Sequence, residues 1–175
     1  MRCLTGSILF AGAVALGTVE VGALPSELRD LVDTPHPAGC SEYRLLFWDF
    51  YRAELWSDAE ELPGEVFGLS LTYRTHFTRD ELVENSVEEM SRISGRPESA
   101  FAEVGVELQR AFRDVVAGDR ITAWSAGPDK LDLFVNGQRA GEMTREADLF
   151  LAIWLGEETR HPEGRQLLLA GRCDG

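Results

Sequence analysis

The sequence lacks the short motifs that carry most recognisable chemistry. It contains no glycine-rich phosphate loop and no Gly-x-Ser-x-Gly nucleophile elbow. Histidine and cysteine are scarce, with three of each among 175 residues, and His36, His76 and His161 lie far apart in the chain. A zinc site needs closely spaced nitrogen and sulfur ligands, so this distribution disfavours one. We therefore expect neither a metal nor another cofactor.

Basic residues are also few. The chain has 17 Lys and Arg against 30 Asp and Glu, which gives a formal net charge of −13. A surface this acidic repels phosphate backbones, so we do not expect nucleic acid as a partner. With 44% hydrophobic and 27% charged residues, the composition is that of one soluble globular domain.

The first 23 residues are predicted to be a cleaved signal peptide. Arg2 supplies a positive start, residues 4–16 are small and apolar, and residues 21–23 provide a small-x-small cleavage pattern. Glu20 interrupts the apolar run before it reaches the about 20 residues that span a bilayer. We expect export to a bacterial periplasm and no membrane span in the mature protein. Residues 24–38 are predicted to be an irregular lead-in to a domain over residues 39–175.

Removal of this leader would leave two cysteines. Cys40 precedes the first predicted strand, and Cys173 lies close to the C-terminus. In an oxidising compartment the two can form a disulfide that fixes the tail to the start of the fold. Two free thiols are the alternative.

Hydrophobic periodicity predicts two strands, two helices, an antiparallel meander and two further helices. The predicted strands cover residues 45–56, 66–75, 120–125, 130–135 and 138–143, the last two joined by an Asn-Gly hairpin turn. The helices are predicted from the N-cap Thr78 to Gly95, from Pro97 to Val115, over residues 147–155 behind a Thr144 cap, and from Pro162 to Ala170. This order is typical of an α+β domain with helices packed on one antiparallel sheet.

Arg44 is the strongest candidate for a ligand-binding residue. It stands beside a strand dense in aromatic residues, which carries a hydroxyl at Tyr51. A cation in apolar surroundings is costly to bury unless an anionic or polar group meets it, and a ligand can supply that group. The structural alternative is an ion pair of Arg44 with Glu42 or Asp49. Tyr51 can likewise be a core aromatic residue.

Several segments, taken in order, resemble the chalcone isomerase-like family, and within it a bacterial branch whose members carry signal peptides. These segments are the aromatic strand at residues 47–56, TRDELVENSVEEM (78–90), the turn at 117–120, LDLFVNGQRAGEM (131–143) and LFLAIWLGEETRHPEGRQLLLAG (149–171). The resemblance spans residues 39–171. It implies a large antiparallel sheet with helices layered on it and a ligand cleft between the two layers.

The resemblance also implies a set of site residues. The plant enzymes of this family line their cleft with an arginine, a strand threonine, a tyrosine and an asparagine near the first helix, and a late hydroxyl. Arg44 matches the arginine, Asn85 matches the helix asparagine, and Tyr51 falls at the strand threonine. Thr78 replaces the tyrosine and Ile153 replaces the late hydroxyl, so two polar groups that would support enone chemistry are missing.

The family also includes plastid proteins that bind fatty acids through an arginine and a nearby strand tyrosine, which Arg44 and Tyr51 resemble. A guanidinium binds a carboxylate bidentately, a phenol adds one donor, and an apolar cleft accommodates the chain. We therefore expect a non-catalytic periplasmic protein that binds a small amphipathic carboxylate such as a fatty acid. The predicted ligand-binding residues are Arg44, Tyr51, Thr78, Asn85 and Ile153.

Two other functions stay open. One is an intramolecular lyase or isomerase that acts on a chalcone-like or other enone substrate through Arg44, Tyr51 and Asn85. The other is a partner-binding protein whose cleft is vestigial, with a protein partner that the sequence does not identify.

Overall fold

The structure is a computed structural model that describes residues 24–33, 37–45, 48–125, 127, 129–171 and 173. The predicted signal peptide lies outside the described residues. Six strands form one antiparallel sheet in the order of the sequence, so that each strand pairs with the next. They are β1 (Gly39–Leu45), β2 (Trp48–Trp56), β3 (Phe67–Tyr73), β4 (Arg120–Ser125), β5 (Leu131–Val135) and β6 (Gln138–Met143).

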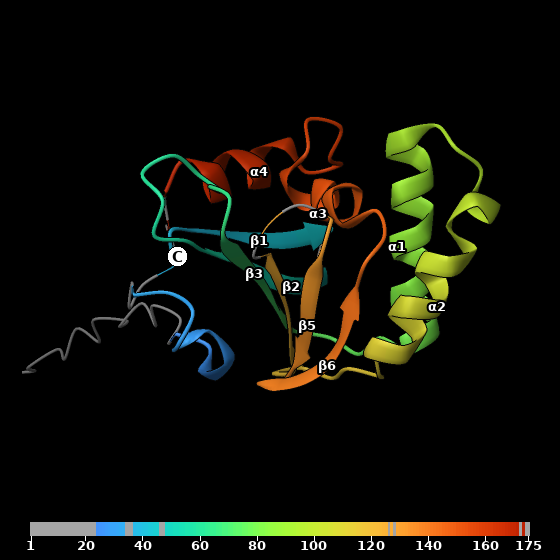
Figure 1. The fold of residues 1–175 in the computed structure, drawn as a ribbon, viewed down its shortest axis with the longest axis horizontal. Helices are drawn as coiled ribbons and strands as arrows, with labels where there is room; N and C mark the ends of the chain where they lie inside the picture. Colours follow the sequence, from blue (N-terminus) through green and yellow to red (C-terminus); the bar gives the residue numbers. More distant parts are fainter. Residues whose placement is uncertain are drawn as a thin grey trace, which may run out of the picture.

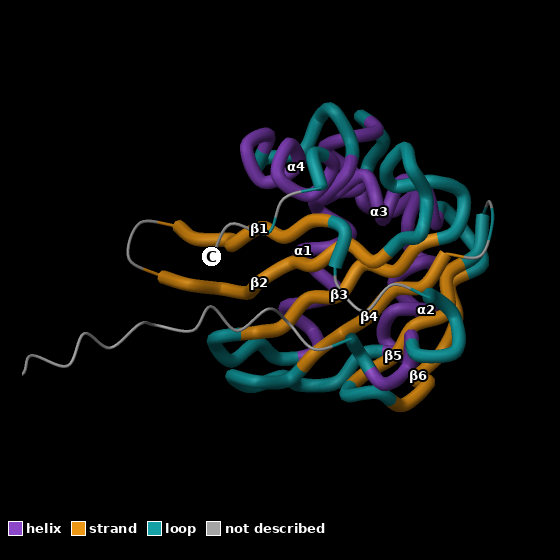
Figure 2. Tube along the Cα trace, turned by 90° about the vertical axis from the view of Figure 1, so that its left-hand side faces the viewer, coloured by secondary structure: helices purple, strands orange, loops and turns teal. Residues whose placement is uncertain are grey.

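A helix layer on one face of this sheet is formed by α1 (Arg79–Ser94), α2 (Ala102–Ala111), α3 (Ala147–Leu155) and α4 (Pro162–Leu169), with the short η2 (Glu98–Phe101). The 3₁₀ turn η1 (Ser26–Leu28) packs on the other face. α1 and α2 stand side by side next to the sheet, and α4 runs along β1 (Figure 1). Figure 2 shows α3 and α4 together on one side of the strands. The predicted α+β class is confirmed.

Local sequence signals explain most of these elements. Thr78 Oγ1 accepts a hydrogen bond from the Glu81 amide, and the Glu81 carboxylate accepts one from the Thr78 amide at 2.8 Å, which completes the predicted capping box. Gly95 ends α1 with φ 68°. Asn136 and Gly137 have φ 51° and 80°, as a two-residue hairpin between β5 and β6 requires.

The strand predicted over residues 45–56 is wrong at its start, because two strands share this region. β1 ends at Leu45 and β2 begins at Trp48. In β1, the buried Ser41 and Tyr43 alternate with the partly exposed Glu42 and the exposed Arg44. Polar residues on both faces leave little hydrophobic alternation, which is the signal that identifies a strand.

The second predicted helix ends early. α2 stops at Ala111, although the prediction extends the helix to Val115. Val115 forms an isolated antiparallel bridge with Phe77 instead, with backbone hydrogen bonds of 2.9 and 3.0 Å. Both residues still bury apolar surface, so the hydrophobic pattern alone did not locate the helix end.

The predicted Thr144 cap of α3 is also wrong. The amide and hydroxyl of Thr144 both donate to the carboxylate of Glu107 on α2, at 3.0 and 2.9 Å. Glu146, with φ 54°, is the residue that directly precedes α3. Thr144 therefore fixes the approach to α3 against α2 and does not cap the helix.

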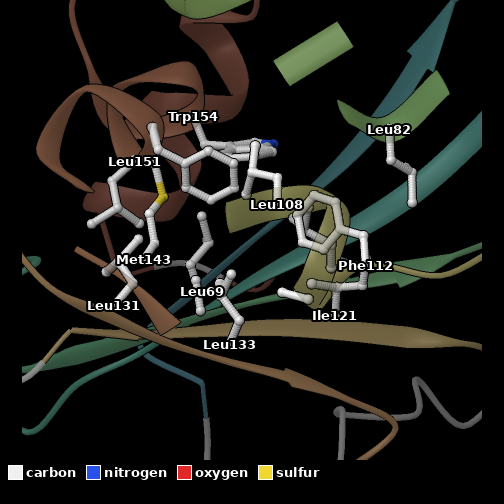
Figure 3. Packing of buried hydrophobic residues seen from close by; sticks show 14 of the residues in the cluster. Leu69, Leu82, Leu108, Phe112, Ile121, Leu131, Leu133, Met143, Leu151 and Trp154 are labelled. Atoms are coloured by element: carbon white, nitrogen blue, oxygen red, sulfur yellow. The ribbon is translucent and has the colours of Figure 1, made fainter. Parts of the chain in front are cut away.

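The hydrophobic core lies between the helix layer and one face of the sheet. Side chains alternate along each strand, so Leu69 and Leu71 of β3 and Ile121 of β4 all point toward the helices. They meet buried helix residues such as Leu108 of α2 and Trp154 of α3, as Figure 3 shows. This packing sets where the helix layer stands over the sheet.

The opposite face of the sheet is partly covered by residues 24–33, which we call the N-terminal strap. Leu28 is fully buried against Trp56 and Trp124. A Cβ atom on Gly68 would lie 2.9 Å from Leu28 Cδ1, so the glycine leaves the room that the leucine fills. The predicted lead-in thus contains a packed 3₁₀ turn.

A buried carboxylate also holds the N-terminal strap. Glu27 accepts hydrogen bonds from the Thr122 hydroxyl at 2.6 Å and from the Arg120 guanidinium at 3.0 Å. Burial acts to raise the pKa of Glu27, but the hydrogen bonds from Arg120 and Thr122 outweigh it and leave the pKa below its usual value. Glu27 is therefore ionised at neutral pH, where the ion pair supports the strap.

Cys40 on β1 and Cys173 form a disulfide, one of the two alternatives that the sequence left open. The bond links the C-terminal tail to the first strand across a separation of 133 residues. No helix in the part of the chain that the structure describes is long and apolar enough to cross a membrane.

Leu28→Ala is expected to lower the free energy of unfolding by about 2–5 kcal/mol, because it leaves a cavity between the strap and the two tryptophans. Leu31→Ala is the matched control, since Leu31 lies in the same strap but is 41% exposed. The control should change stability by less than about 0.5 kcal/mol. Urea unfolding measures both, and equal losses would contradict the docking of the strap.

The double variant Cys40→Ser/Cys173→Ser is expected to be about 2–5 kcal/mol less stable than the oxidised protein, because the unfolded chain regains a long loop. Denaturation of the wild type with reductant should match the variant. If reductant did not change the stability of the wild type, the Cys40–Cys173 disulfide would be contradicted.

Candidate functional site

A cavity of about 250 Å³ lies between the sheet and the helix layer, and we call it the apolar pocket. Strands β2, β3 and β4 form one wall, and helices α1 and α3 form much of the other. The described lining residues are Phe50, Tyr51, Leu69, Leu71, Tyr73, Phe77, Leu82, Asn85, Ser86, Glu89, Phe112, Ile121, Ala123, Phe150, Ile153 and Trp154.

The pleat of the sheet and the repeat of the helix place these side chains. Tyr51 on β2 is directly opposite Tyr73 on β3, so both rings project from the same face. On α1, Leu82, Asn85 and Glu89 follow one another at intervals of three and four residues and therefore share one side of the helix. That side faces the apolar pocket.

A hydrogen bond connects the two walls of the apolar pocket. Trp154 Nε1 on α3 donates to the hydroxyl of Tyr51 on β2 at 2.9 Å. The Tyr51 ring stacks on Tyr43 with 4.8 Å between centroids, and it meets Tyr73 edge-on at 5.7 Å. This bond fixes α3 over β2 and holds the Tyr51 oxygen in one place.

The three tyrosines of this cluster are not bases at neutral pH. Burial raises the pKa of Tyr51, and the hydrogen bond from Trp154 offsets only part of that rise. Burial likewise raises the pKa values of Tyr43 and Tyr73 above the ordinary value of a phenol. All three phenols stay protonated, so each keeps an O–H that can donate a hydrogen bond.

Glu89 is the one charged side chain among the described residues that line the apolar pocket. One of its oxygens lies 2.5 Å from Arg160 Nε, and the other accepts a hydrogen bond from Arg92 at 2.9 Å. Both oxygens are therefore already held by guanidinium groups. The described lining contains no arginine or lysine of its own.

The structure brings three of the five predicted ligand-binding residues together. Tyr51, Asn85 and Ile153 all line the apolar pocket. Thr78 is not among the described lining residues, and its hydroxyl takes part in the capping box of α1.

Arg44 does not share the apolar pocket with Tyr51, which corrects the expectation that the two meet in one cleft. Arg44 follows Tyr43, the cross-strand neighbour of Tyr51, so alternation along β1 places it on the other face of the sheet, where it pairs with Asp49 at 2.5 Å, the structural alternative raised by the sequence. Its side chain is 58% exposed. Contact of Arg44 with a ligand stays a prediction.

Arg44 lines a second, polar cavity of about 520 Å³ between β1 and the start of α4. The arginines of this cavity already have partners. Arg52 pairs with Glu42 at 2.9 Å, and Arg160 pairs with Glu89 at the apolar pocket. The charges of the second cavity are therefore compensated from within the protein.

Sequence reasoning missed Tyr73, Glu89 and Trp154 as pocket residues. Tyr73 carried a signal, since it continues the alternation of the apolar side of β3. Glu89 carried none, because it is one of 30 acidic residues and lies on a largely solvated helix. Across the described parts of the chain, no group of three or more His, Cys, Asp or Glu could hold a metal ion.

The fold of this protein is similar to that of a known protein, although the sequence comparisons found no match. No protein-family model matches the sequence, and no curated protein matches it significantly. A crystal structure of a fatty-acid-binding protein from Arabidopsis thaliana aligns with a TM-score of 0.55 over 77% of this chain and 86% of that chain, at 12% identity. The architecture is therefore the chalcone isomerase-like fold. At this identity the likeness shows the fold alone.

Tyr51→Phe is expected to lower the free energy of unfolding by about 1–3 kcal/mol, because it leaves the buried Trp154 N–H without its partner. Tyr43→Phe is the matched control. The Tyr43 hydroxyl is buried without a hydrogen-bond partner in the described structure, so its removal should be neutral or stabilising. Denaturation followed by tryptophan fluorescence measures both variants. Equal destabilisation would contradict the stabilising role of the Trp154–Tyr51 bond.

Proposed function

We propose that this protein binds a small amphipathic ligand of the fatty-acid class, without catalysis, in the apolar pocket. The pocket itself carries the proposal. Its described lining is mostly aromatic and aliphatic, with a few polar groups such as those of Tyr51, Tyr73 and Asn85. Ligand sites typically have this character, in which apolar surface supplies affinity and a few polar groups fix orientation.

The size of the apolar pocket sets the size of the ligand. An apolar cavity of about 150 Å³ accommodates benzene, so about 250 Å³ corresponds by proportion to about ten heavy atoms. Each methylene buried there contributes about 0.8 kcal/mol. A chain of about ten carbons is therefore the best-fitting probe of the pocket.

The fold comparison supports the same class of ligand. The Arabidopsis protein that shares this architecture is named for fatty-acid binding. In this protein the sheet and the helix layer border the apolar pocket, whose mainly apolar lining suits the alkyl chain of such a ligand.

An intramolecular lyase or isomerase is the second candidate, favoured by one observation: Tyr51 and Asn85 lie in the same pocket. Tyr51 stays protonated, Arg44 lines the other cavity, and the Glu89 carboxylate is held by two arginines, so none of these described groups is set up to promote phenolate attack on an enone. Turnover of a chalcone that disappears in Tyr51→Phe would establish the enzyme.

We also propose that the protein is exported to a bacterial periplasm, as in the signal-peptide-bearing branch that the sequence resembles. The leader-like residues 1–23 support this location, and so does the disulfide, since such bonds persist in oxidising compartments. After expression with export, the intact mass should correspond to a chain that begins at Leu24. A mass that retains residues 1–23 would contradict the proposal.

Ile153→Trp is expected to abolish binding of decanol while the protein remains folded, because the larger side chain fills the apolar pocket from α3. Val106→Trp is the matched control, since Val106 is on α2 and 48% exposed. Calorimetric titration with decanol, beside a circular dichroism spectrum, measures the three proteins. Equal binding by wild type and Ile153→Trp would show that the ligand does not occupy this pocket.

A further inference from the structure

We infer that the apolar pocket receives the head group of its ligand uncharged, so that a fatty acid binds as the protonated acid. Neutral amphiphiles of the same length, such as a primary alcohol, should then bind at least as well as the carboxylate. This inference rests on the proposed function and specifies the ligand class of the same site.

The first argument is the missing counter-charge. An ionised carboxylate can be buried only beside a cation or several donors, since its desolvation is otherwise too costly. The described lining of the apolar pocket includes no arginine or lysine, and its one charged group is the carboxylate of Glu89. A ligand carboxylate would therefore meet a like charge at the α1 wall.

The second argument is that the nearest arginines are already engaged. Arg92 and Arg160 bind the two oxygens of Glu89, and Arg160 also pairs with Glu88 at 3.1 Å. Arg44 pairs with Asp49 at the other cavity. A ligand carboxylate would have to share these cations with carboxylates of the protein, so it would gain less from them than from an unpaired arginine.

The third argument is the set of neutral groups that the pocket offers. The Tyr51 oxygen accepts from Trp154, so its own O–H remains a donor for which the described residues provide no acceptor. Within the same described set, the Tyr73 hydroxyl and the Asn85 amide have no hydrogen-bond partner either. A carboxylic acid or an alcohol can accept from the tyrosines and also donate to the Asn85 carbonyl oxygen or to Glu89, whereas an ionised carboxylate can only accept and would face Glu89 as a like charge.

The titratable groups that face this site come from three elements. They are Tyr51 on β2, Tyr73 on β3 and Glu89 on α1, with Arg92 and Arg160 behind Glu89. The described lining residues of α3 and β4 are uncharged. The tyrosines stay protonated at neutral pH, so they do not change the charge of the pocket between about pH 4 and about pH 7.

The direction of the pH effect follows from mass action. A free carboxylic acid ionises near the value of a glutamate side chain, about pH 4.3, so its neutral form falls about tenfold per pH unit above that value. If the pocket takes only this form, the apparent dissociation constant for decanoate rises about tenfold for each unit of pH. Decanol, which does not ionise, should bind almost independently of pH.

The experiment compares decanoate and decanol by calorimetric titration at about pH 5 and about pH 7, with decanoate carrying a ¹³C label in the carboxyl group. We expect decanoate to weaken nearly a hundredfold between these two values and decanol to change by less than about threefold. The ¹³C resonance of bound decanoate should keep the position of the protonated acid at pH values where free decanoate is ionised. This signal reports the ligand itself and is independent of protein titration.

Two other outcomes would overturn the inference. In the first, the ¹³C resonance of bound decanoate lies at the position of the carboxylate, its affinity does not depend on pH, and decanol still binds. This result would leave the proposed function in place but show that the head group binds in its charged form. Loss of decanoate binding in Arg160→Gln or Arg44→Gln, with decanol binding retained, would assign that arginine as its anchor. Failure of both ligands to bind at either pH would instead refute the proposed function.

Discussion

The hydrogen bond from Trp154 to Tyr51 is the interaction on which the candidate site depends. It joins α3 to β2 beside a cavity of about 250 Å³, where the two layers of the fold are not in full contact. Without it, the buried indole N–H of Trp154 would lose the partner that ties α3 to β2. The same bond occupies the acceptor side of the Tyr51 hydroxyl and leaves its proton directed elsewhere, so it shapes the chemistry of the pocket as well as its geometry.

The sheet predisposes this region to form a pocket. Tyr51 and Tyr73 are cross-strand neighbours, and Tyr43 stacks on Tyr51 from the other side. Large flat rings on adjacent strands make a rigid floor that side chains from α1 and α3 cover incompletely. The polar cavity beside α4 has a different character, because arginines and acids of the protein form ion pairs along its lining.

The parts of the fold that sequence predicted well are those with strong local signals. The Thr78 capping box, the Asn136–Gly137 turn and the alternating strand β3 are each encoded within a few residues, and the structure contains all three. β1 was missed because its polar outer face weakens the alternation. The cap of α3 was misassigned because Glu107, which binds Thr144, is remote in sequence.

The residues of the candidate site also divide into those that the sequence could identify and those that it could not. Tyr51, Asn85 and Ile153 could be identified by resemblance and lie together, whereas the face of Arg44 could not be assigned because the sequence did not predict the register of β1. A one-residue change of register moves a side chain to the other face of a sheet, and no local pattern announces it. Glu89 and its two arginines come from α1 and from a loop far along the chain, so only the tertiary structure reveals that the pocket is electrically compensated.

The most direct test of a ligand in the apolar pocket is native mass spectrometry of the mature protein, purified from a bacterial periplasm without detergent, beside Ile153→Trp. The account predicts a co-purifying small amphipathic molecule on the wild type that is absent from the variant. The same adduct on both proteins would place the ligand outside the pocket. A wild type that is bare and also fails to take up added decanol would contradict the central claim.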